Sequence, residues 1–337
     1  LTQWLFGSGK ADPFSLCAVL SDNRSRTHIL IFGGTGSGKS LTIKSNLHQA
    51  KEAGHKLIIL DRKGEYTEEI AEKDFHLFGK HDKRQFQWDV AKDIKNIPDI
   101  KQFIAVVIPR NDSDPIWSDA ARIIATGLFA HLLKTEPGKW SLIGFLKLCL
   151  RPTEELIDIA IAAYPQAAEV LKGEERTLSS FMVNMAVFTT PIKDFALEWE
   201  GSGYPKLSYS EWLEDHSPAK KCLIFQSGGG KYSEQNDPMI RASLNYISGY
   251  VDSPSFKRDS VEEPRSIWFF CDEFQSFGKL DVMAKNIIER GRDKGLRMVI
   301  GVQDVSQLRE VYGEDFVKAL MSSVGITILA GANQGET

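Results

Sequence analysis

Residues 33–40 hold the clearest chemical signal in the chain, because they read Gly-Gly-Thr-Gly-Ser-Gly-Lys-Ser. This run matches the P-loop pattern GxxxxGK[ST] and lies between an apolar run and a helix-like stretch. Its glycines let backbone N–H groups converge on phosphate oxygens, and the following helix adds partial positive charge. In this pattern Lys39 reaches the β- and γ-phosphates, and the Ser40 hydroxyl ligates Mg²⁺. The run therefore predicts a site for ATP with Mg²⁺. The predicted nucleotide-binding residues are Gly33, Gly34, Thr35, Gly36, Ser37, Gly38, Lys39, Ser40 and Leu41.

A second motif stands at the end of another apolar run, where Asp272 and Glu273 follow residues 267–271. This is the Walker B form, in which Asp272 would hold the Mg²⁺ shell together with Ser40, and Glu273 would polarise the attacking water. Acidic residues often end strands in solvent, so the motif gains its meaning from the P-loop in the same chain. The adjacent Glu273 favours a hydrolysing, motor-type ATPase over a GTPase switch or a small-molecule kinase.

Two further residues lie around a third apolar run, 298–302. Gln303 ends this run, where an amide could sense the γ-phosphate or orient the water; the alternative is a Gln that hydrogen-bonds a loop. Arg292 lies in the charged stretch 289–297 before the run. Charge runs are usually solvated faces, and this stretch alone assigns Arg292 no role.

Composition places the chain among ordinary soluble globular proteins, because 42% of its 337 residues are hydrophobic and 26% are charged. Its net charge of −4 argues against a surface coated with Lys and Arg for nonspecific nucleic-acid binding. A local groove or pore that grips nucleic acid stays compatible with that charge. The four cysteines form no CxxC pair and the seven histidines show no paired spacing, so we expect no zinc site.

The ends of the chain suggest that it is part of a longer protein. It opens at Leu1 without an initiator Met and stops at Thr337, soon after a strand-like run. No apolar run approaches the ~20 residues that span a bilayer. We therefore expect an excised segment of a longer protein.

Six short apolar runs predict the scaffold, and they are continuous instead of alternating. That pattern is typical of strands buried on both faces, as in a parallel sheet covered by helices. Helical spacing follows the P-loop, with Gly54 as the expected stop. The fold class is therefore α/β, with a mostly parallel sheet between helical layers. The predicted strands are 28–32, 57–60, 222–225, 267–271, 298–302 and 326–330.

One region, about 116–204, has no convincing strand and reads as helices. Asp114 and Pro115 form an N-cap and first helical position, and apolar residues then follow at helical spacing. Further helices are expected at 141–150, 153–163 and 174–190. We therefore expect an all-α domain inserted into a nucleotide-binding domain. The predicted division is 1–115 for the first part of the nucleotide-binding domain, 116–205 for the insertion and 206–337 for the second part, which would be truncated.

Together these features resemble the conjugative type IV coupling proteins of the TrwB kind (the TraD/TraG group), within the FtsK–HerA group of ring-shaped DNA motors. The resemblance covers almost the whole chain, and the helical stretch lies where that family has its all-α domain. The segments with the closest resemblance are 27–40, 57–65, 210–215 and 268–313.

The resemblance implies a RecA-like P-loop domain with Lys39, Ser40, Asp272 and Glu273 in the roles given above. It also implies Gln303 as γ-phosphate sensor and Arg292 as a finger that reaches the neighbouring subunit's nucleotide. By the same likeness the parent would be a homo-hexamer, anchored in the bacterial inner membrane by helices outside this chain, with this part in the cytoplasm. Its partners would be single- or double-stranded DNA, relaxase and relaxosome proteins, and components of the type IV secretion channel.

Two classes of function follow. The first is an ATP-driven pump that delivers a relaxase-bound DNA strand to the secretion channel during conjugation, and the set Glu273, Gln303 and Arg292 favours it. The second is an adaptor platform in which ATP sets a conformation that recruits protein substrates. A chromosomal DNA translocase of the same superfamily is the alternative within the pump class. Residues 227–232, Ser-Gly-Gly-Gly-Lys-Tyr, are either a flexible loop or a DNA contact.

Overall fold

The computed structural model describes residues 27–171, 175–259, 265–278, 280 and 285–331. These residues divide into two compact units. The first, here called the sheet unit, takes the described residues of 1–78, 216–229 and 248–337. The second, the helical unit, takes those of 79–215 and 230–247. None of the described helices is both long and apolar enough to cross a membrane.

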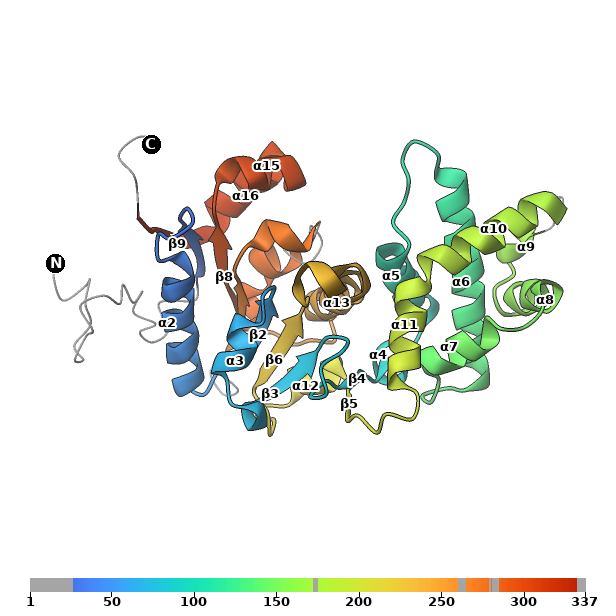
Figure 1. The fold of residues 1–337 in the computed structure, drawn as a ribbon, viewed down its shortest axis with the longest axis horizontal. Coiled ribbons are helices and arrows are strands. Elements are labelled where there is room, and N and C mark those ends of the chain that lie inside the picture. Colours follow the sequence, from blue (N-terminus) through green and yellow to red (C-terminus); the bar gives the residue numbers. More distant parts are fainter. Residues whose placement is uncertain (1–26, 172–174, 260–264, 279, 281–284, 332–337) are drawn as a thin grey trace. The chain divides into compact units, whose positions relative to one another are not determined.

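The sheet unit is organised around seven strands whose pairings are all parallel. Figure 1 labels β3, β6, β2, β8 and β9 of this sheet. The order is β3-β6-β2-β7-β8-β1-β9, so β7, β8 and β1 are neighbours. This confirms the α/β class with a parallel sheet. The strands are β1 (His28–Phe32), β2 (Lys56–Asp61), β3 (Phe75–Phe78), β6 (Cys222–Gln226), β7 (Ile267–Cys271), β8 (Leu296–Val302) and β9 (Val324–Leu329).

All six predicted strands are present, and burial explains why their apolar runs are continuous. Every residue of β2 and of β7 is buried, as expected for central strands covered on both faces. At the edge of the sheet, β9 instead alternates between exposed and half-buried residues. The other edge strand, β3, was missed because four residues that include His76 give too short an apolar signal.

Helices connect these parallel strands. The P-loop helix ends at the predicted place, because Gly54 follows it with a left-handed φ of 76°. Residues 227–232 are not a loop throughout, since Gly228 is the N-cap of a helix that starts at Gly229. The helices are α2 (Lys39–Glu52), α3 (Glu65–Glu69), α13 (Gly229–Asp252), α15 (Val305–Tyr312) and α16 (Glu314–Ser323), and residues 230–247 of α13 belong to the helical unit.

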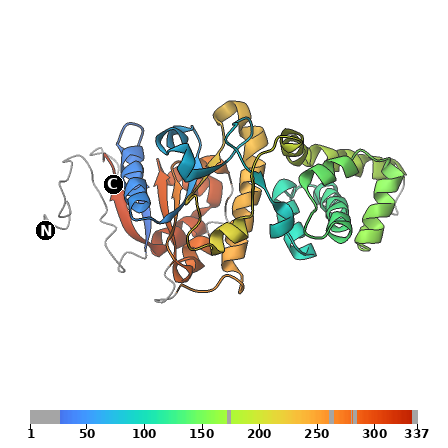
Figure 2. The same cartoon turned by 90° about the horizontal axis from the view of Figure 1, so that it is seen from below.

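The helical unit contains the predicted helices, and Figure 2 shows α6 to α11 as a group of coils in green tones. Helix α6 packs against α5, α7, α8, α9 and α10. At its centre the ring of Phe129 stacks on Phe145, with ring centroids 4.2 Å apart. The helices are α4 (Val90–Asp93), α5 (Ile97–Val107), α6 (Pro115–Thr135), α7 (Leu142–Leu148), α8 (Thr153–Ala163), α9 (Ala167–Leu171), α10 (Glu175–Phe188), α11 (Thr190–Trp199) and α12 (Tyr209–Glu214).

One local detail differs from expectation, and another lies outside the described residues. Asp114 is the N-cap residue of α6, but its carboxylate accepts a hydrogen bond from the Trp117 indole at 3.0 Å instead of capping a backbone N–H. The expected start of a helix at residue 174 lies outside the described residues, and α10 is described from Glu175.

The helical unit extends beyond 116–205, the range predicted for the inserted domain. Part of the reason is α5, which packs on α6 through an edge-to-face contact of Phe103 with Phe129. Another part is the buried Asp93 carboxylate, around which the short parallel strands β4 (Gln87–Trp88) and β5 (Lys206–Leu207) and the start of α12 gather. It accepts hydrogen bonds from Trp88, Ser208, Tyr209, Ser210 and Tyr246. The predicted boundaries of the inserted all-α domain stay a prediction.

His28 ties the amino end of β1 to two neighbouring segments. Its Nε2–H donates to the Ile288 carbonyl at 3.0 Å, and its Nδ1 accepts from the Met298 backbone N–H at 3.1 Å. Only a neutral ring with its proton on Nε2 can make both bonds, because a protonated Nδ1 cannot accept. Burial is the main cause that lowers the pKa of His28, from its ordinary value of 6.5 to about 4.

We therefore predict that the chain loses stability as the pH falls from about 6.5 towards 4. In this window the unfolded chain binds a proton at His28 that the folded chain does not, so protons favour unfolding, by at most ~1.4 kcal/mol per pH unit. Urea unfolding of wild type and His28→Leu between pH 4.5 and 7.5 measures the difference. The variant should be less stable at pH 7.5 but show a flatter pH dependence. An equal slope in both proteins would contradict the assignment.

Candidate nucleotide site

The P-loop joins β1 to α2 through a turn whose backbone conformation glycine adopts without strain. Gly36 and Gly38 have φ values of 78° and 86°, in the left-handed region that favours glycine. The Gly33 N–H donates to the Val302 carbonyl at 3.1 Å, which fixes the start of the loop to the end of β8. Because Gly38 is also the N-cap of α2, no side chain competes for the first N–H groups of that helix. The loop thus has the form of an anion-binding nest.

Asp272 connects the two motifs that were found separately in the sequence. Its Oδ1 lies 2.9 Å from Lys39 Nζ, and its Oδ2 accepts from the Ser40 hydroxyl at 2.5 Å. The Lys39 side chain is only 7% exposed, so this ion pair is shielded from solvent. The two residues predicted to ligate Mg²⁺, Ser40 and Asp272, are therefore in direct contact.

Gly301 makes room for this contact, and sequence reasoning missed it. It lies on β8 beside the end of β7, because Cys271 of β7 pairs with Ile300. A Cβ at Gly301 would come within 2.8 Å of Asp272 Oδ1 and 2.7 Å of Ile43 on α2. A glycine inside a buried strand is a signal of such close approach.

Glu273 has an unusual backbone and a cationic partner. Its φ of 62° is left-handed, which costs a non-glycine residue ~1 kcal/mol or more and is typical of functional sites. The side chain accepts a hydrogen bond from Lys63 Nζ at 3.0 Å. That hydrogen bond and the charge of Glu273 raise the pKa of Lys63.

Gln303 and Arg292 lie at opposite ends of the strands: Gln303 at the carboxyl ends, here called the carboxyl edge, and Arg292 at the amino ends, the amino edge. Gln303 directly follows β8, whose last carbonyl holds the P-loop, so it lies at the same edge as Lys39 and Asp272. Arg292 starts a short 3₁₀ turn before β8 begins, at the amino edge, and its charge contributes to the low pKa of His28. Within one chain, Arg292 and the P-loop therefore lie at opposite ends of the strands.

The end of β2 and the start of α3 add two residues, Asp61 and Tyr66, that sequence reasoning did not assign. Asp61 is buried and accepts hydrogen bonds from the backbone of Gly64, Tyr66 and Thr67. The Tyr66 hydroxyl is buried and, within the described residues, has no hydrogen-bond partner. It lines a void of about 10 Å³ together with Asp272 and Glu273, a space that suits roughly one water. Burial first, and then the charge of Asp272, raise the pKa of Tyr66, so it stays a phenol that can donate.

Comparison with known proteins decides the family. The family model for the DNA-binding domain of type IV secretion-system coupling proteins matches residues 17–337. The chain belongs to this family. This confirms the resemblance found in the sequence.

Relatives of this coupling-protein domain agree in sequence and fold. The coupling protein TraD of Escherichia coli (strain K12) is 25% identical over 293 residues, which is 86% of this chain and 40% of that protein. The chain thus spans about 40% of the length of this curated relative. The structure of conjugative coupling protein TrwB with sulphate matches with a TM-score of 0.73 at 22% identity, covering 91% of this chain and 71% of that one. TrwB in complex with ADP and Mg²⁺ matches with a TM-score of 0.70 at 22% identity, covering 88% and 68%. The RecA-like fold is confirmed by these matches.

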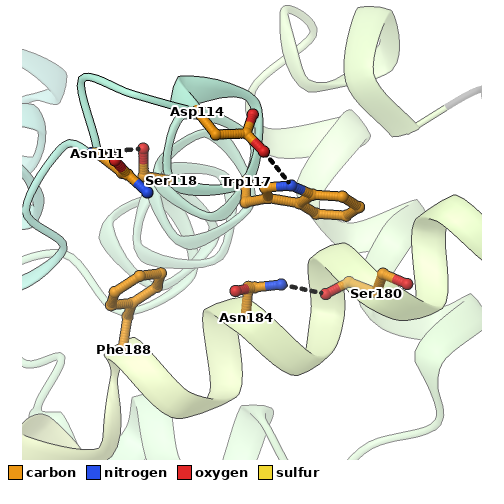
Figure 3. A pocket seen from close by; sticks show the side chains of 7 residues that line it. All are labelled: Asn111, Asp114, Trp117, Ser118, Ser180, Asn184 and Phe188. Atoms are coloured by element: carbon orange, nitrogen blue, oxygen red, sulfur yellow. Dashed lines mark hydrogen bonds between the residues drawn. The ribbon is translucent and has the colours of Figure 1, made fainter.

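The coupling-protein domain also has a groove of about 400 Å³ in its helical unit, which Figure 3 shows between the amino end of α6 and the facing side of α10. Within it Trp117 donates to Asp114, and the Asn184 amide donates to the Ser180 carbonyl. None of the described residues that line it is basic, so the groove has no side-chain cation for a phosphate. These lining residues are Asn111, Asp114, Trp117, Ser118, Ser180, Asn184 and Phe188.

Proposed function

We propose that this chain is the ATP-hydrolysing part of a type IV coupling protein that moves DNA towards a secretion channel. The observation that carries the proposal is the contact of Asp272 with both Lys39 and Ser40, at 2.9 and 2.5 Å, beside Glu273. Membership of the coupling-protein family supports the role in conjugation. The TrwB complexes with ADP and Mg²⁺ and with a non-hydrolysable ATP analogue support ATP and Mg²⁺ as its ligands.

Each residue of the site has a distinct task in this mechanism. Mg²⁺ would neutralise charge on the phosphates, held by Ser40 and Asp272. Lys39 balances the β- and γ-phosphate charge at the start of α2. Glu273 accepts a proton from the attacking water, and Gln303 at the same edge orients that water or senses the γ-phosphate.

The position of Arg292 supports an assembly in which active sites are shared. An arginine finger at the amino ends of the strands of its own sheet would serve the P-loop of another subunit. We therefore propose a homo-hexameric parent whose neighbouring subunits complete one another's sites. Its proposed partners are single- or double-stranded DNA, relaxase and relaxosome proteins and channel components, with an inner-membrane anchor outside this chain and this part in the cytoplasm.

We predict that Glu273→Gln retains ATP affinity but loses ~10²–10⁴-fold in turnover. The amide keeps the shape of the side chain yet cannot accept a proton. Steady-state ATPase assays and fluorescent-nucleotide titration measure the two quantities. Glu154→Gln, an exposed acid on α8, is the matched control and should behave as wild type.

A near-wild-type ATPase rate for Glu273→Gln would mean that Glu273 is a structural acid, and would contradict the proposed mechanism. The same assay separates the pump from the alternatives. A rise in wild-type ATPase rate on addition of single-stranded DNA supports the pump, whereas a rate that responds only to protein substrates supports the adaptor platform. Equal stimulation by any chromosomal duplex would instead support a chromosomal translocase.

We predict that Arg292→Ala inactivates a homogeneous ring, since a finger is worth ~10³–10⁵ in rate. Mixing it with Glu273→Gln subunits should restore part of the activity, because some interfaces then pair an intact Glu273 with an intact Arg292. The assay needs rings shown to contain both variants. Near-normal activity of Arg292→Ala alone would contradict the finger, and loss without rescue would contradict its action on a neighbouring subunit.

A further inference from the structure

The general base proposed above is held by a lysine from the segment 57–65, to which the sequence analysis gave no role. Lys63 Nζ lies 3.0 Å from Glu273 Oε1, and the two side chains are 60% and 22% exposed. Lys63 comes from the loop after β2, and Glu273 from the turn after the neighbouring strand β7. Two parallel strands thus bring a cation and the catalytic carboxylate together at one edge.

The loop that presents Lys63 is fixed from inside the sheet. Asp61 accepts hydrogen bonds from the Gly64 N–H at 2.8 Å, from the Thr67 N–H at 2.8 Å and from the Thr67 hydroxyl at 2.7 Å. Gly64 has a left-handed φ of 86°, which lets the chain turn into α3 directly after Lys63. The loop is therefore a defined turn, and Lys63 has a set place beside Glu273.

Arg62 holds the same loop from two other sides. Its guanidinium lies 5.6 Å from the centroid of the Phe277 ring, in the turn that Glu273 begins. It also donates to the Ser227 hydroxyl at 3.0 Å, and its carbonyl accepts from the Gly229 N–H at 3.2 Å. The loop thus links the turn after β7 to the start of α13.

This geometry has a consequence for proton transfer. A charge-assisted hydrogen bond from an ammonium group occupies one acceptor position of a carboxylate and fixes the direction in which the side chain points. Oε2 of Glu273 stays open to a water, but the bond from Lys63 to Oε1 limits how freely the carboxylate can turn towards the water that attacks ATP.

We propose that Lys63 is a positioning residue that restrains Glu273, so that opening of their ion pair precedes ATP hydrolysis. This proposal rests on the proposed role of Glu273 as general base. The restraint is modest, because an exposed ion pair is weak and screened by salt. Its removal should therefore accelerate the basal reaction instead of stopping it.

The test is the ATPase rate of Lys63→Ala and Lys63→Gln in the assembled protein without DNA. We expect kcat to rise about three- to fivefold, equivalent to about 0.7–1 kcal/mol, with KM for ATP unchanged. Lys63→Arg keeps the charge and should stay near the wild-type rate. Lys51→Ala removes a cation that pairs with Asp74 at the far end of α2, and should leave the rate unchanged.

Added salt gives a readout that a purely structural role would not produce. The ratio of the Lys63→Ala rate to the wild-type rate should fall towards one as ionic strength rises, because salt weakens the pair only in wild type. An unchanged or lower kcat in both Lys63→Ala and Lys63→Gln, with far-UV circular dichroism like wild type, would overturn the proposal. A lower kcat would mean that Lys63 assists catalysis.

The background of Glu273→Gln separates this proposal from the one on which it rests. If Glu273→Gln is inactive and Lys63→Ala brings no acceleration in the wild-type background, only the restraint fails. If Glu273→Gln hydrolyses ATP at a near-wild-type rate, the general base itself is wrong. If both proposals hold, Lys63→Ala raises the ATPase rate in the wild-type background and has no such effect in the Glu273→Gln background.

Discussion

The contact of the Asp272 carboxylate with Lys39 and Ser40 is the interaction on which the site depends. It joins the loop after β1 to the end of β7, although β8 lies between these strands. Such a contact requires the strands to be parallel and in register, so that their carboxyl ends meet at one edge. Gly301 leaves room for it, because a Cβ there would come within 2.8 Å of Asp272 Oδ1. The buried strands and the helices that cover them serve this alignment.

The same topology explains why other polar and charged side chains are kept apart or brought together. Gln303 and Lys63 follow strands and therefore lie at the carboxyl edge, whereas Arg292 precedes a strand and lies at the amino edge. Arg292 is thereby separated from its own P-loop. Its proposed role as an arginine finger therefore requires a site shared between two subunits. Glu273 is the residue at which the two sets of contacts meet, since it adjoins Asp272 in the chain and pairs with Lys63.

Much of this could be predicted from the sequence where the signal is local. A P-loop and a strand ending in Asp272 and Glu273 are contiguous patterns, and continuous apolar runs report strands buried on both faces. The pairing of Lys63 with Glu273 joins residues 210 positions apart and leaves no local pattern. The void beside Tyr66 and the need for Gly301 also arise only when strands pack. The extent of the helical unit depends on the buried Asp93 and on the packing of α5, neither of which changes the local spacing of apolar residues.

The most direct measurement of the central claim is the effect of Mg²⁺ on ATP affinity in wild type and in Asp272→Asn, by fluorescent-nucleotide titration. In wild type, Mg²⁺ should tighten ATP binding if Asp272 and Ser40 ligate it as proposed. In Asp272→Asn most of that gain should disappear, while affinity without Mg²⁺ should not fall, since Lys39 is released from its ion pair and stays available to the phosphates. The same gain from Mg²⁺ in both proteins would contradict the assignment of Asp272 and of the site built around it.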